Sequence, residues 1–159
     1  MSQFLKAFLF VVLLNNVVTA QDSGFGSLVS DRGKPMQFIS DSLIYNREEN
    51  VAELFDEVEV RQGNSVLSAH YIKAVYSKTD NKLEQIFAER NVELKSDKDI
   101  ARADKATYSL SKDVISLTGN AHLIQGGNNI FADQILINTK TGLTELLGSV
   151  KTVIVPSKN

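Results

Sequence analysis

The side chains best suited to catalysis or metal binding are few in this sequence. The chain has 159 residues, with two histidines, His70 and His122, and no cysteine. The histidines lie about fifty residues apart, whereas a zinc site needs ligands at close spacing, and no serine has the context of a nucleophile elbow. The sequence therefore predicts no catalytic residue, no metal site and no cofactor.

Three aspartates, Asp41, Asp104 and Asp133, are the remaining candidates for chemistry. A catalytic carboxylate pair needs two acids in unlike environments at a set distance, whereas these acids recur at matching places, as structural residues do. The acidic stretch 97–99 lacks the glycine and closing glutamate of a calcium loop. The glycines of 24–26 lack the third glycine of a dinucleotide-binding loop. We therefore expect a protein that is not an enzyme.

The aspartates belong to an internal repeat with two signals. The first is a small residue followed by Asp or His, and it occurs at Ser40-Asp41, Ala69-His70, Ala103-Asp104 and Ala132-Asp133. The second is found in "DEVEV", "RNVEL", "GNAHL" and "GSVKT". Its first apolar residue follows the Asp or His by 17 residues in three copies and by 22 in the copy at His70. The longer copy contains "SKTDNKLEQ", which is typical of a longer turn, and the overall period is about 29 residues.

Short runs of Val, Ile, Leu, Thr and Tyr alternate with polar residues from about residue 36 onward, which predicts an all-β fold. One face of the strands is apolar and carries Leu43, Tyr45, Ile72, Tyr76, Ala106, Tyr108, Ile135 and Ile137. The opposite face carries Ser42, Lys73, Lys105 and Gln134, with Ile44 and Leu136 among them, so both faces are expected to be covered in places. Such a sheet can close against a second sheet or stay open for an apolar ligand.

The N-terminus has the features of a secretory signal peptide over residues 1–20. Lys6 supplies a positive charge, residues 7–14 are apolar, and residues 18–20 place small side chains before a cleavage point. The alternative is an uncleaved membrane anchor, but the apolar run is shorter than the roughly 20 residues of a spanning helix. We expect residues 21–34 to be a flexible segment.

The charge balance excludes one class of partner. The formal net charge is -2, and it becomes about -3 when the signal peptide with Lys6 is removed. A chain so balanced has no excess of cations to hold a phosphate backbone, so no nucleic acid partner is expected. Without cysteine no disulfide forms, and the fold must depend on its core.

Several segments resemble the LptA family of the OstA-like superfamily, whose members transport lipopolysaccharide. They are "PMQFISDSL", "VEVRQG", "LTGNAHLIQGGNNIFADQI" and "VKTVIVPS", and the resemblance covers residues 35–157. It implies one domain there, folded as a twisted, incompletely closed antiparallel β-jelly roll. It also implies export to the periplasm.

The resemblance further implies that acyl chains of lipopolysaccharide (lipid A) lie against the apolar interior. Jelly rolls of the family join end to end, so the implied partners are LptC-like inner-membrane proteins, LptD-like outer-membrane proteins and further copies in a head-to-tail homo-oligomer. The implied lipid-binding residues are Met36, Phe38, Leu43, Ile72, Tyr108, Ile135 and Ile137. The implied partner edge is Val150, Val153 and Val155, and the residues that could meet lipid phosphates are Lys34, Arg61 and Arg102.

Three other functions are consistent with the sequence. The first is an LptC-like subunit of the same pathway, anchored by its N-terminal segment. The second is a secreted β-repeat protein that binds polysaccharide, although a period of about 29 residues is long for one turn of a solenoid. The third is a structural β-repeat protein that assembles into filaments and has no affinity for lipid.

Overall fold

The computed structural model describes residues 24–156, which form one antiparallel sheet of ten strands and one short helix. The predicted signal peptide, residues 1–20, lies outside the described residues. The elements in chain order are α1 (Gly26–Asp31), β1 (Met36–Ile39), β2 (Ser42–Asn46), β3 (Val51–Gln62), β4 (Ser65–Tyr76), β5 (Leu83–Ser96), β6 (Asp99–Ser109), β7 (Val114–Gln125), β8 (Asn128–Asn138), β9 (Thr144–Leu147) and β10 (Lys151–Val153). The prediction of an all-β fold is confirmed.

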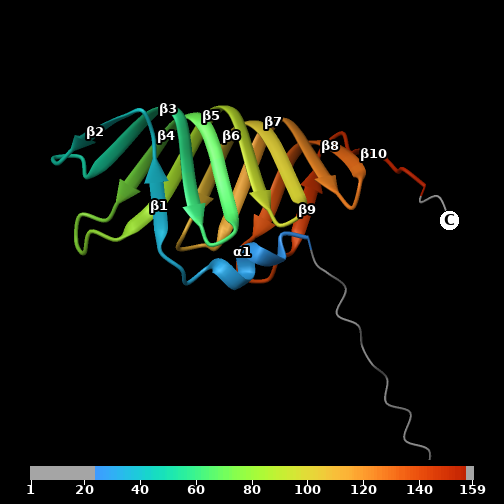
Figure 1. Ribbon diagram of the computed structural model, residues 1–159, viewed down its shortest axis with the longest axis horizontal. Coiled ribbons are helices and arrows are strands. Elements are labelled where there is room, and N and C mark those ends of the chain that lie inside the picture. Colours follow the sequence, from blue (N-terminus) through green and yellow to red (C-terminus); the bar gives the residue numbers. More distant parts are fainter. Residues whose placement is uncertain (1–23, 157–159) are drawn as a thin grey trace, which may run out of the picture.

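The strands follow each other through the sheet almost in chain order. The order is β1-β3-β4-β5-β6-β7-β8-β10, with β2 also paired to β3 and β9 also paired to β8 (Figure 1). The strands at the two ends do not pair with each other, so the sheet does not close into a barrel. Among the residues that the structure describes, no helix is long and apolar enough to cross a membrane.

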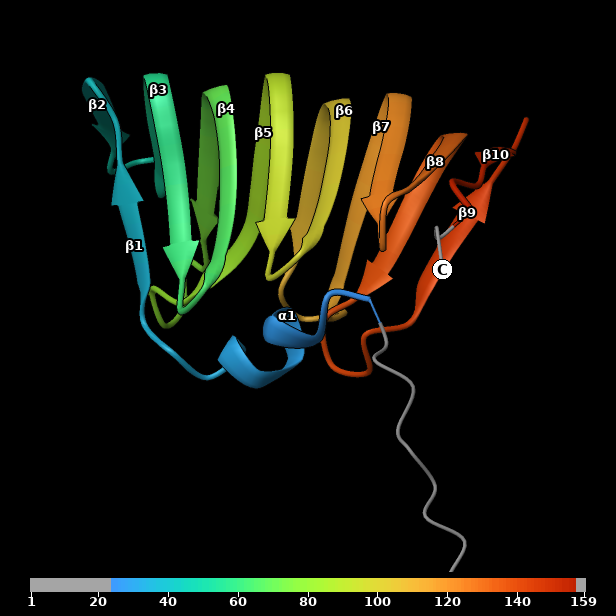
Figure 2. The same cartoon turned by 45° about the vertical axis from the view of Figure 1, so that its right-hand side comes forward.

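Each long strand bends near its middle, so that one half lies in each of two walls (Figure 2). One wall contains β2, β9 and the halves of the long strands β3 to β8 that lie between them, and we call it the β2–β9 wall. The β1–β10 wall contains β1, β10 and the other halves of the same long strands. At the bends of β3, β5 and β7 the register shifts and two successive residues have positive φ. Such bulges bend a strand and increase its twist. These corner residues are Asp56 and Glu57, Arg90 and Asn91, and Gly119 and Asn120, and Gly148 and Ser149 form the equivalent pair between β9 and β10.

The corners explain both signals of the sequence repeat. The second signal begins with the two corner residues of a strand, and the first signal lies on the neighbouring strand beside that corner. The small residues Ala69, Ala103 and Ala132 are buried, which lets the two walls approach each other. The acid that follows points to the corner, where the carboxylate of Asp104 accepts a hydrogen bond of 2.8 Å from the side chain of Asn120. The repeat therefore marks the places where the strands bend.

The interior between the walls is filled by rows of apolar side chains that run across the strands. Residues paired in register share one face of a sheet, so each row belongs to the same face. Two rows of the β2–β9 wall are Leu54, Ile72, Ala88, Ala106, Leu117 and Ile135, and Ala52, Ala74, Ile86, Tyr108, Ile115 and Ile137. The facing row of the β1–β10 wall is Val60, Leu67, Leu94, Ala101 and Leu123. All of these side chains are buried in a single core.

Helix α1 lies within the segment 21–34 that was expected to be flexible. Phe25, which precedes the helix, and Leu28 within it are both buried in the core. Their spacing of three residues places them on one side of a helical turn, so that both side chains enter the interior together. The described part of the segment is therefore folded against the sheet.

We predict that the corner at Gly119 tolerates no side chain. Gly119 has φ 77°, and a Cβ there would lie 2.6 Å from Oδ2 of Asp104. Because the left-handed conformation alone costs about 1–2 kcal/mol for other residues, Gly119→Ala should lower the free energy of unfolding by about 2–3 kcal/mol in a urea titration. Gly126→Ala is the matched control, because Gly126 has φ 57° and open space around it. Equal losses in the two variants would show that the contact with Asp104 has no effect.

Candidate functional site

The apolar interior is the candidate site. Four residues predicted from the sequence, Ile72, Tyr108, Ile135 and Ile137, are buried together in it. Met36 and Phe38, on β1, are partly buried and pack against the same core from the edge of the β1–β10 wall. The structure therefore brings six of the seven predicted lipid-binding residues to one apolar core.

Leu43, the seventh predicted residue, lies elsewhere. It pairs with Leu54 and so belongs to an interior row by register, but it is 55% exposed because β2 is the last strand of its wall. Its neighbours Ile44 and Tyr45 are also exposed. The residues predicted for the partner edge, Val150, Val153 and Val155, are exposed at the opposite end of the sheet, in and around β10.

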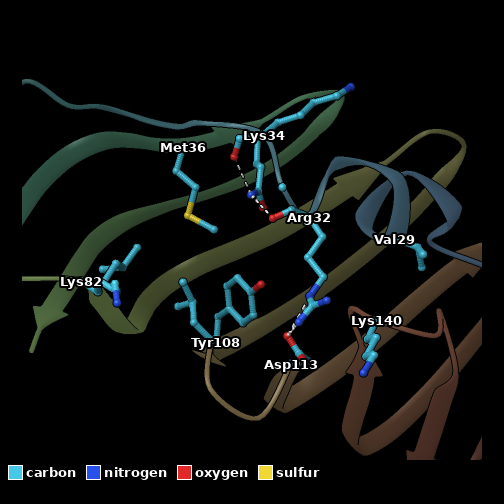
Figure 3. A pocket seen from close by; sticks show the side chains of 12 residues that line it. Val29, Arg32, Lys34, Met36, Lys82, Tyr108, Asp113 and Lys140 are labelled. Atoms are coloured by element: carbon cyan, nitrogen blue, oxygen red, sulfur yellow. Dashed lines mark hydrogen bonds and ion pairs between the residues drawn. The ribbon is translucent and has the colours of Figure 1, made fainter. Parts of the chain in front are cut away.

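The interior opens along the side opposite the corners, between the two rows of turns. A pocket of about 690 Å³ lies in this opening, which we call the mouth, and it is lined by residues from both rows of turns and from the segment after α1. Figure 3 shows Arg32 extending to Asp113, with the side chains of Met36 and Tyr108 beside it. Behind the pocket a second cavity of only about 30 Å³ reaches into the core, lined among others by Leu28, Met36, Leu67, Leu94 and Ile115.

Three cations that line the mouth, Arg32, Lys34 and Lys82, are paired with acids. The guanidinium of Arg32 lies 2.6 Å from the carboxylate of Asp113 in the turn after β6. The ammonium of Lys82 lies 2.7 Å from Asp80, and hydrogen bonding to Lys82 lowers the pKa of Asp80 to about 2. An anionic ligand at the mouth would therefore compete with these carboxylates for the cations.

Asp31 is a buried acid at the end of α1. Lys34 pairs with its carboxylate at 2.7 Å, and the backbone N–H of Asn64 donates to it at 2.6 Å. The hydrogen bond from Lys34 is the main cause that lowers the pKa of Asp31, although burial acts in the opposite direction. Asp31 thus fixes the end of α1 to the turn between β3 and β4.

The histidines have structural contacts. The side-chain amide of Asn91, a corner residue, donates to Nε2 of His70 at 3.0 Å. His122 stacks on Phe131 with ring centroids 4.3 Å apart and donates from Nε2 to Asn129 at 2.9 Å. Over residues 24–156 no group of three or more His, Cys, Asp or Glu side chains could hold a metal ion.

Two of the three cations considered for lipid phosphates lie away from the mouth. Arg61 alternates with the buried Val60 and so points to the outer face, where it pairs with Glu59. Arg102 pairs with Glu93 at 2.7 Å on the same outer face. Of these three predicted cations, Lys34 is the one that lines the pocket at the mouth. The sequence analysis did not predict a role for Arg32, Phe25 or Leu28. The three-residue spacing of Phe25 and Leu28 was the one signal that could have indicated two apolar side chains on one side of a helical turn.

The fold and the site together define a class: a β-jelly roll that is open along one side, with an apolar interior and with no metal-binding cluster among its described residues. Comparison with known proteins agrees with this class. The family model for "LptA/(LptD N-terminal domain) LPS transport protein" matches residues 38–143. The chain belongs to this family, which consists of transport proteins without enzymatic activity.

Two relatives are similar over nearly their whole length. The lipopolysaccharide export system protein LptA of Haemophilus influenzae is 26% identical, and the match covers 93% of this chain and 92% of that protein. The crystal structure of LptH, the LptA homologous periplasmic component of the lipopolysaccharide transport device from Pseudomonas aeruginosa, has a TM-score of 0.71. It is 19% identical, and the match covers 80% of this chain and 99% of LptH, so it supports the fold. The family and the open jelly roll predicted from the sequence are both confirmed.

We predict that Asp31 stabilises the protein in a pH-dependent way. Since its pKa in the folded protein is below the ordinary value of 3.8, its charge stabilises the fold above that pH, and this contribution is lost as the pH falls through the lowered pKa. Asp31→Asn should therefore lower the midpoint of thermal unfolding at pH 7, and the difference from wild type should shrink below about pH 3.8. A difference that stays constant down to pH 2 would contradict a role for the charge.

Proposed function

We propose that this protein binds lipopolysaccharide by taking acyl chains into the apolar interior and passes it between membranes as one unit of an end-to-end bridge. The observation that carries the proposal is the continuous apolar core between two walls that never close. Each buried methylene gains roughly 0.8 kcal/mol, so several acyl chains supply enough free energy for binding without any covalent step. The family and the names of the two relatives support this ligand.

The two ends of the sheet differ from each other, and both expose apolar side chains, which supports assembly of copies head to tail. At one end β2 exposes Leu43, Ile44 and Tyr45, and at the other the segment around β10 exposes Val153 and Val155. Apolar side chains next to unpaired strand edges are suited to pairing with another chain. A second copy that pairs its β1 and β2 end with the β9 and β10 end of the first would continue both walls.

The proposed partners follow from the same geometry. An LptC-like protein of the inner membrane would pair with one end of the bridge, and an LptD-like protein of the outer membrane would pair with the other end. Between these two partners, copies of this chain would pair with each other in the same way. The proposed location is the periplasm. Residues 1–20 would direct export to it as a signal peptide and would then be cleaved. The relative from Pseudomonas aeruginosa is described as a periplasmic component, which supports this location.

We predict that the inner face of β1 contacts lipid and the outer face does not. Phe38 packs against the core and Ile39, its neighbour on the same strand, faces outward and is exposed. Phe38→Asp should weaken binding of lipopolysaccharide by at least about tenfold in a titration of residues 21–159, because it places a charge against the acyl chains. Ile39→Asp introduces the same charge on the opposite face and should bind as the wild type does. Equal losses in both variants, or none in either, would contradict lipid in the interior.

We predict that assembly is head to tail. Ile44→Asp should block one end and Val155→Asp the other, because a carboxylate on an exposed apolar edge is costly to bury. Each variant alone should stay monomeric in sedimentation velocity at concentrations where the wild type forms longer species. A mixture of the two variants should form dimers and nothing larger, since only one pair of intact ends is left. Longer species in the mixture would be inconsistent with this arrangement.

A further inference from the structure

Helix α1 lies in the mouth of the interior (Figures 1 and 2). On one side it contacts the turns of the β1–β10 wall: the N–H of Phe25 donates to Asp99 at 2.7 Å, and the hydroxyl of Ser27 lies 3.1 Å from that of Ser65. On the other side Arg32, at its C-terminal end, reaches Asp113 in a turn of the β2–β9 wall. The helix is therefore attached to both walls across the opening.

The helix also fills the interior that it covers. Phe25 is fully buried and Leu28 is 7% exposed, and both belong to the same core as the rows of the two walls. The cavity that remains beside Leu28 has only about 30 Å³. An acyl chain does not fit into this space. Entry of acyl chains into the interior, beyond the pocket at the mouth, therefore requires that side chains leave the interior or that the walls separate.

The helix is the part of the core that can leave most easily. It has only six residues, and isolated helices of this length are not stable in water. Phe25 has a left-handed conformation, with φ 62° and ψ 33°, and makes no side-chain cap for the helix. The ion pair of Arg32 and Asp113 is partly exposed, and such pairs contribute little to stability. The strands, in contrast, are held by continuous ladders of paired residues on both sides.

We propose that α1 is a displaceable plug, and that acyl chains of the ligand enter the interior where Phe25 and Leu28 now lie. This inference depends on the proposed function, because it assumes a lipid ligand. Displacement of the plug opens the ion pair between Arg32 and Asp113 and breaks the hydrogen bond from the N–H of Asn64 to Asp31. It exposes Val60, Leu67 and Ile86, which line the cavity beneath the helix. The same apolar surface is thus covered by the chain itself before lipid arrives.

A reversible cross-link tests the plug. The chain has no cysteine, so Ser27→Cys/Ser65→Cys would form a single disulfide, and the hydroxyls at these positions already lie 3.1 Å apart. With the disulfide oxidised, the plug cannot leave, and binding of fluorescent lipopolysaccharide should weaken by at least about tenfold. Reduction with dithiothreitol should restore it, and the single variant Ser27→Cys should respond to neither treatment. Tight binding by the oxidised protein would overturn the plug and leave lipid binding intact.

A second variant keeps the test decisive if the cysteines themselves disturb the site. Phe25→Ser weakens the plug and leaves the strands unchanged, so it should bind lipopolysaccharide faster and more tightly than wild type. If Phe25 were only a core residue, its loss would weaken binding, and that result would overturn the proposal. Failure of the wild-type protein to bind lipopolysaccharide at all would instead remove the proposed function, and the plug with it.

Discussion

The corner on which every long strand bends is the constraint that the rest of the structure depends on. A strand of this length in a flat sheet would leave one apolar face without cover. Because the chain bends at the same level in successive strands, each strand supplies both walls, and the sheet covers its own apolar face. In every second long strand the corner has two successive residues with positive φ, with a small side chain opposite them, and these are the features that the sequence repeats.

The fold could be predicted from the sequence to the extent that alternation is visible. Ile72, Ile135 and Ile137 were assigned to an apolar face because side chains in a strand alternate, and all three are buried. Leu43 follows the same alternation and is exposed, since alternation does not show that its strand is the last one in its wall. Burial at a sheet edge depends on what lies beyond it.

The corners and the plug could not be predicted from the sequence, and the reasons differ from the one that applies to Leu43. The second repeat signal did not lead to a prediction of corners, because Glu57 and Arg90 are not residues that favour positive φ, and only the glycine, asparagine and aspartate at equivalent places suggest it. Helix α1 has too few turns to produce a helical pattern. Its position depends on contacts with turns far away in the sequence, such as those of Asp31 with Asn64 and of Arg32 with Asp113.

The regular rows of the interior have a consequence for motion along it. Successive strands lie about 4.8 Å apart, so the pattern of two strands and one corner recurs about every 9.6 Å along the stack. A hydrocarbon chain that moved in this direction would meet apolar side chains at every step, although their sizes differ, as at Leu54, Ala88 and Leu117. Its free energy would then rise and fall with the spacing of the strands, and a bias applied at one end would give the movement a direction.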